Sequence, residues 1–177
     1  MFNGTYLDAI RQALHDAMAA DERVFCLGED IGVYGGAFGA TAGLLETFGE
    51  IRVIDTPIAE QAIAGAAIGA ALMGRRPVAE FQFMDFALLA SDLICNFAAG
   101  TRWRWGAPCP VVFRGPRAPA STADPSIART PKGISSAAPA SRSWRRAPWR
   151  TLTPSCAPAS TTPTPSSSWS TRPSTGA

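Results

Sequence analysis

The sequence predicts an α/β fold in which a parallel β-sheet carries helices on both faces. Short apolar runs alternate with helical patterns up to residue 116, and these runs are apolar at successive positions rather than at every second one. Composition changes after that point. Residues 1–116 carry 8 Lys+Arg and 13 Asp+Glu, whereas residues 117–177 carry 8 and 1 and are mainly Ser, Pro, Ala, Thr and Arg. We therefore expect one domain at 1–116 and an unstructured segment at 117–177.

Four helices are predicted from apolar residues that recur every three or four positions. The first begins with Thr5 and Asp8 at the spacing of a capping box. A short second helix closes at Gly49, and the third begins at Glu60 and stops at Gly74. The fourth is an amphipathic helix over residues 85–105, with Asp85 near its cap.

Four strands are predicted between these helices, at residues 24–30 (ending in a turn), 51–55, 77–83 and 109–115. Residues 31–43, "IGVYGGAFGATAG", are rich in glycine but contain neither G-x-G-x-x-G nor a GKS/GKT sequence. A flexible surface loop is therefore favoured there over a phosphate-binding loop. In parallel sheets of this kind, ligands bind beyond the carboxyl ends of the strands. Glu60 and residues 82–86 follow two such ends.

Four segments together carry a family resemblance: "LGEDIGVYGGAF", "IDTPIAEQAIAGAAIGAA", "AEFQFMDF" and "PVVFRGP". In this order they resemble the beta subunit of the thiamine-diphosphate-dependent 2-oxo acid dehydrogenase E1 component, of the pyruvate, branched-chain or acetoin type. The resemblance runs from Thr5 to Pro116. It implies a transketolase-like pyrimidine-binding domain that takes part in oxidative decarboxylation of a 2-oxo acid and reductive acylation of a lipoyl group.

The resemblance also implies roles for individual residues. Glu60 matches the glutamate that bonds N1′ of the cofactor's aminopyrimidine ring and assists loss of the proton at C2 of its thiazolium ring. Ile58, Gln82 and Phe86 match the pyrimidine pocket, with Phe86 stacking on the ring. Each has a plainer interpretation: Glu60 as a first-turn acid favoured by the helix dipole, the other three as strand-end packing.

Gly65 and Gly69 have the G-x-x-x-G spacing that lets helices approach closely. The resemblance implies that this helix packs across a subunit interface, and the alternative is packing on its own sheet. The family's alpha subunit holds Mg and the diphosphate with a GDG…N motif, and no GDG occurs here. The chain would thus supply half of a thiamine diphosphate site, with no metal ligands of its own, in an alpha2beta2 heterotetramer that serves the E2 lipoyl acyltransferase.

Other classes of partner are not expected. The four cysteines, Cys26, Cys95, Cys109 and Cys156, form no CxxC pair. The N-terminus lacks a signal-peptide pattern, and the longest apolar stretch, residues 62–73, is too short to span a membrane. Arginines after residue 116 lie in no nucleic-acid-binding module. A cytoplasmic protein without membrane or nucleic-acid partners is expected.

The segment 117–177 is interpreted as an out-of-frame translation. With suitable codons, a one-base shift turns "TTPTPSSSWSTRPST" into "DDPDPVVLVEHKALY" and "TLTPSCAPAS" into "DAYALLRASI", both similar to the family's continuation. The break lies near Pro116 and Arg117. We therefore expect the chain as given to be inactive because it is truncated. The alternatives are a non-catalytic fragment or another pyrimidine-binding domain of the transketolase superfamily.

Overall fold

The computed structural model describes residues 4–116. Four strands form one parallel sheet: β1 (Val24–Gly28), β2 (Val53–Asp55), β3 (Arg76–Glu80) and β4 (Val112–Arg114). Their order is β2-β1-β3-β4, so β1 and β3 are central and β2 and β4 form the edges. The predicted α/β class is confirmed. The predictions for 117–177, including Cys156, lie outside the described residues.

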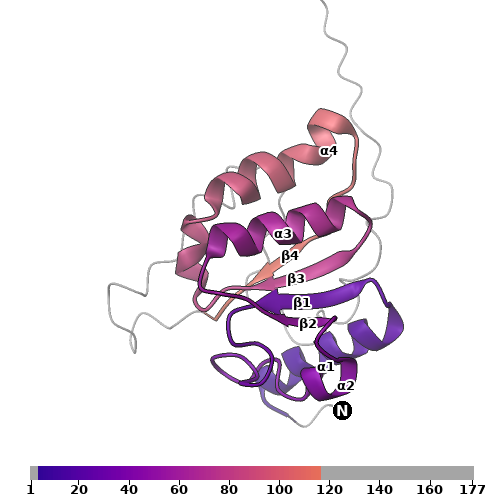
Figure 1. The fold of residues 1–177 in the computed structure, drawn as a ribbon, viewed down its shortest axis with the longest axis vertical. Helices are drawn as coiled ribbons and strands as arrows, with labels where there is room; N and C mark the ends of the chain where they lie inside the picture. The colour runs from indigo at the N-terminus through magenta and orange to yellow at the C-terminus, as the bar shows by residue number, and fades with distance from the viewer. Residues whose placement is uncertain (1–3, 117–177) are drawn as a thin grey trace, which may run out of the picture.

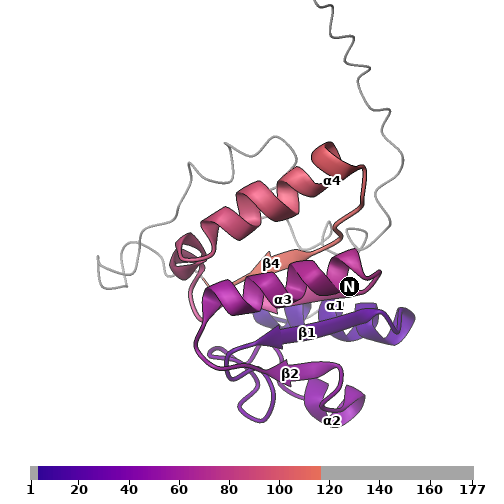
Figure 2. The same cartoon turned by 45° about the horizontal axis from the view of Figure 1, so that its top comes forward.

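Helices cover both faces of this sheet (Figures 1 and 2). Helices α1 (Tyr6–Ala20) and α2 (Leu44–Phe48) lie on one face, where they contact β1 and β2 respectively. On the other face lies α3 (Glu60–Leu72), which contacts β3 and β1, with α4 (Ala99–Trp105) beside it. Crossover connections of this kind are required to join parallel strands.

Each face of the sheet has its own hydrophobic core. Alternate residues of β1 point to opposite faces, so Phe25 and Leu27 pack towards α3 while Val24 and Cys26 pack towards α1. The α3 core is composed of Phe25, Leu27, Ile63, Ala64, Ala67, Ala79, Phe81, Ala87 and Ala90. The α1 core is composed of Met18, Val24, Cys26, Ile31, Leu44, Val53 and Val78. The central strand β1 therefore contributes to both cores.

Sequence signals for the helix ends are confirmed. Thr5 caps α1, and its side chain and that of Asp8 form the reciprocal bonds of a capping box. Gly49 follows α2 directly, and Gly74 takes a left-handed conformation two residues after α3.

Two element predictions need correction. The edge strands are not buried on both faces: in β2 only Val53 is buried, and β4 has no fully buried residue. The single helix predicted at 85–105 is instead a 3-10 turn, η1 (Met84–Leu88), a π-helical segment, η2 (Leu93–Ala98), and α4. Ala87 and Ala90 are both buried in the α3 core, and this spacing of three suits the 3.0-residue period of a 3-10 turn.

The glycine-rich segment, residues 31–43, is also packed more closely than the flexible surface loop that the sequence predicts. Ile31, Ala40 and Thr41 are buried, and the Thr41 hydroxyl donates to the carbonyl of Ile31 at 2.7 Å. The Gly39 carbonyl accepts two hydrogen bonds from the Arg11 guanidinium of α1, at 2.7 and 3.1 Å. The segment therefore folds back against the sheet and α1 as a packed unit.

Within residues 4–116, no helix is long and apolar enough to cross a membrane.

Candidate functional site

The site is built on one row of the sheet where the four strands end together. In the parallel register, Gly28 lies opposite both Asp55 and Glu80, and Glu80 lies opposite Arg114. The residues that follow each strand therefore emerge at the same edge, as expected for a ligand site in such a fold. Glu29 and Asp30 follow β1, the turn before Glu60 follows β2, and Phe81 and Gln82 follow β3.

Two buried glutamates meet at this edge. Glu60 lies in the first turn of α3 with 7% of its surface exposed, and Glu29 has 3% exposed. Burial raises the pKa of the Glu29 carboxyl, and the nearby charge of Glu60 raises this pKa further. One carboxyl oxygen of Glu29, Oε1, is buried without a hydrogen-bond partner among the described residues. A buried acceptor of this kind indicates a site that a ligand or a shared proton completes.

The predicted site residue Gln82 contacts a residue that the sequence analysis did not single out. Its side-chain amide nitrogen donates to Asp30 Oδ2 at 3.3 Å. Asp30 follows Glu29 directly and has a left-handed backbone, with φ of 54°. Non-glycine residues adopt this conformation infrequently, and such residues are concentrated at functional sites.

Aromatic rings continue the same edge. Phe86 has 38% of its surface exposed, so a ring face is available for stacking, and it packs edge-to-face on Phe83 with centroids 5.9 Å apart. Phe83 in turn contacts Phe38 of the glycine-rich segment, edge-to-face at 6.3 Å. Ile58 is 83% exposed, so the described residues do not enclose it in a pocket. Sequence reasoning missed Phe38, and it placed Phe83 at this edge only as part of the range 82–86.

Polar contacts fix the glycine-rich segment beside these groups. Asp55 Oδ1 accepts from the Gly32 amide at 2.7 Å, which ties the segment to the end of β2. At Gly36, with φ of 83°, a Cβ atom would lie 3.1 Å from Thr41 Oγ1 and 3.3 Å from Glu80 Oε1, so both the backbone conformation and the limited space favour glycine. Glu80 is itself paired with Arg114. The paired Glu80 side chain therefore lies beside Gly36 of the segment.

The outer face of α3 carries the two glycines of the predicted interface. Residues 63, 64, 67, 68 and 71 are buried, whereas Gly69 is exposed and a Cβ atom there would meet nothing within 4 Å. At Gly65 the nearest atom would be Leu93 Cδ1 at 3.8 Å, an ordinary contact. Gly65 thus lies beside η2 of the same chain and Gly69 is exposed, and their place at a subunit interface stays a prediction.

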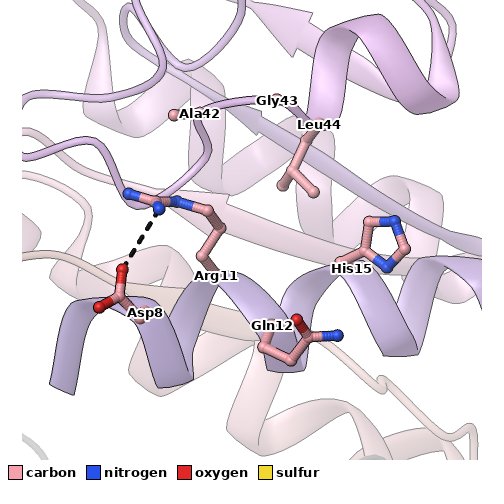
Figure 3. Close-up of a pocket in the computed structure, with 7 residues that line it drawn as sticks. All are labelled: Asp8, Arg11, Gln12, His15, Ala42, Gly43 and Leu44. Atoms are coloured by element: carbon pink, nitrogen blue, oxygen red, sulfur yellow. Dashed lines mark hydrogen bonds and ion pairs between the residues drawn. The ribbon is translucent and has the colours of Figure 1, made fainter. Parts of the chain in front are cut away.

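A separate hollow lies between α1 and the start of α2 (Figure 3). It has a volume of about 360 Å³ and is lined by Asp8, Arg11, Gln12, His15, Ala42, Gly43 and Leu44. The Arg11 guanidinium points towards Asp8, with which it forms an ion pair at 3.3 Å. None of the predicted site residues lines this hollow. Within residues 4–116, no group of three or more His, Cys, Asp or Glu is arranged to hold a metal ion.

Comparisons with known proteins agree with this geometry. The family described as "Transketolase, pyrimidine binding domain" matches residues 4–126. Over 116 residues the chain is 54% identical to a 2-oxoisovalerate dehydrogenase subunit beta of Bacillus subtilis. The matched region covers 63% of this chain and 35% of that protein. It is 50% identical over 119 residues to a pyruvate dehydrogenase E1 component subunit beta of Rickettsia felis, covering 66% and 36%.

The human mitochondrial pyruvate dehydrogenase E1 component subunit beta is 45% identical over 114 residues, covering 63% of this chain and 32% of that protein. The chain thus spans about a third of the length of these curated relatives. The parallel sheet, the site at its carboxyl edge and the family match lead to one conclusion: the chain belongs to the transketolase pyrimidine-binding domain family, and its relatives include E1 beta subunits of 2-oxo acid dehydrogenases.

Proposed function

We propose that the chain provides the pyrimidine-binding half of a thiamine diphosphate site in the E1 component of a 2-oxo acid dehydrogenase. The observation that carries this proposal is the buried pair Glu29 and Glu60 at the carboxyl edge of the sheet. The unpartnered Glu29 Oε1 and the exposed ring of Phe86 suit a flat, nitrogen-containing ring. The E1 reaction, oxidative decarboxylation of a 2-oxo acid with reductive acylation of the lipoyl group of E2, is the activity proposed for the assembly.

In this role Glu60 holds N1′ of the aminopyrimidine ring, Phe86 stacks on the ring face, and Gln82 borders it. When bound, thiamine diphosphate supplies the carbanion chemistry that decarboxylation needs. Burial keeps water away from Glu60, which strengthens its bond to the ring. Burial, and then the nearby charge of Glu60, raises the pKa of the Glu29 carboxyl, which favours a proton on Glu29 beside the ring.

The rest of the site is proposed to come from an alpha subunit. The chain has no GDG sequence, and residues 4–116 present no metal cluster. The exposed Gly69 of α3 offers a surface where a partner helix can approach closely, in keeping with an alpha2beta2 assembly. By itself the chain is proposed to be inactive and to bind the cofactor weakly. Calorimetric titration of the isolated chain with Mg and thiamine diphosphate tests this, and micromolar affinity would contradict the two-subunit site.

The role of Glu60 is tested in a frame-corrected chain, with the residues after Pro116 restored to the proposed reading frame, together with its alpha partner. Glu60→Gln should reduce decarboxylation, measured with an artificial electron acceptor, by about 10²–10⁴-fold. Glu46→Gln is the matched control, because Glu46 is an exposed acid in the first turn of α2. If Glu60 serves only the helix dipole, both variants lose about 0.3–1 kcal/mol of stability and keep their activity.

A further inference from the structure

The backbone of Asp30 is held in place by contacts of Asp30 itself and of its two neighbours in the chain. Among residues 4–116 it is the one non-glycine residue with a left-handed backbone, φ 54°. Its neighbours Glu29 and Ile31 are buried, and its carbonyl oxygen accepts from the Gly36 amide at 2.8 Å. Because a left-handed conformation costs a non-glycine residue about 1–2 kcal/mol, the surrounding contacts must impose it. The imposed backbone leaves the Asp30 side chain in contact with Gln82.

The contact with Asp30 determines which end of the Gln82 amide faces Asp30. An ionised carboxylate can only accept hydrogen bonds, so the group 3.3 Å from Asp30 Oδ2 must be the NH₂ end of that amide. The carbonyl oxygen, Oε1, is then turned away from Asp30 and is free to accept. Without the carboxylate, the amide could present either end.

We propose that Asp30 is a positioning residue that fixes the Gln82 amide so that the site offers a hydrogen-bond acceptor to its ligand. The ligand group it selects is an N–H donor on a ring, such as the exocyclic amine of an aminopyrimidine. This inference rests on the proposed function, because the ring is that of thiamine diphosphate. Asp30 acts through Gln82 and does not itself touch the ligand.

The variant Asp30→Asn isolates this effect. Asn has the same size and is, with Asp, the non-glycine residue that best tolerates a left-handed backbone. It can donate as well as accept, so the Gln82 amide loses its preferred orientation. Asp92→Asn is the matched control, because Asp92 also accepts from a side-chain amide, that of Asn96 at 2.6 Å, and both residues are exposed.

The experiment measures binding, by calorimetry, of thiamine diphosphate and its 4′-oxo analogue to the frame-corrected chain assembled with its alpha subunit. In the analogue a carbonyl oxygen replaces the exocyclic amine. Asp30→Asn should lower the preference for the amino compound about 3–10-fold, the value of one hydrogen bond. Asp92→Asn should leave the preference unchanged. In a Gln82→Leu background, Asp30→Asn should have no further effect on the preference.

Two results overturn the inference. One is an unchanged preference in Asp30→Asn, and the other is an equal loss of affinity for both compounds, which would mean that Asp30 only supports the backbone. Failure of the proposed function is distinguishable from both. An assembly that binds neither compound removes the proposed function and this inference with it, whereas binding with an unchanged preference removes this inference alone.

Discussion

Replacing Gly69 by alanine should have opposite effects on the chain alone and on its assembly. Within the chain, a Cβ atom at Gly69 meets nothing within 4 Å, and the residue lies inside α3. Alanine is about 0.5–1 kcal/mol more favourable than glycine in a helix, so the isolated chain should gain about that much stability. If a partner helix packs against Gly69, the same methyl group overpacks the contact and costs about 1–3 kcal/mol.

Two measurements check this prediction. Urea unfolding followed by far-UV circular dichroism gives the free energy of unfolding of the chain alone. Sedimentation velocity over a concentration series gives the affinity of the frame-corrected chain for its alpha partner, which should fall about 5–150-fold. Gly74→Ala is the control for the sign of the stability change, since its φ of 87° makes alanine unfavourable there. Destabilisation by Gly69→Ala in the isolated chain, or an assembly as tight as the original, would refute the reasoning.

Three further predictions concern stability, measured by urea unfolding at controlled pH. Arg52→Met should cost about 2–4 kcal/mol of unfolding free energy, because the Arg52 guanidinium donates to three backbone carbonyls of the α1–β1 region. Arg23→Met is the control: Arg23 is an exposed ion-pair residue, and its replacement should cost about 0–1 kcal/mol. Similar losses of stability in the two variants would contradict this prediction. Burial raises the pKa of the Cys26 thiol to about 12, so stability should fall by about 4 kcal/mol as the pH rises from 9 to 12, and Cys26→Ala should remove that fall. Burial, and then the charge of Glu60, raises the pKa of the Glu29 carboxyl in the folded chain. The contribution of Glu29 to stability is therefore complete below its pKa in the unfolded chain, and it is lost as the pH rises through its pKa in the folded chain. Glu29→Gln should therefore gain stability relative to the original chain from pH 4.5 upwards, and a constant difference would contradict the coupling.

Features encoded within a short stretch of sequence were the most predictable. The capping box at Thr5, the stop at Gly49 and the alternation of apolar runs with helices each depend on residues close together in the chain, and the structure contains them all. The same holds for the place of Glu60 at a helix start beyond a strand. The distinction between one long helix and a 3-10 turn at Ala87 was not predictable, because it depends on which residues the core requires.

Contacts between distant loops were also beyond prediction. Asp30 and Gln82 meet only because β1 and β3 are neighbours in register, and Phe38 reaches Phe83 for the same reason. A sequence pattern shows that each residue follows a strand, but it does not give the order of the strands. Had that order been assumed, the position of Glu29 at the end of a central strand would have marked it as a candidate.

The central place of β1 has a consequence for the order in which the chain folds during its synthesis. Both strands that pair with β1 come later in the chain, and β3 ends at Glu80, about 50 residues after Gly28. At roughly 5–20 residues per second, a ribosome needs roughly 3–10 seconds to make that stretch. Until β2 is made, β1 has no partner for its backbone groups, and until β3 is made one of its two edges stays unpaired. The nascent chain is therefore most exposed to aggregation, and most dependent on chaperones, before β3 emerges.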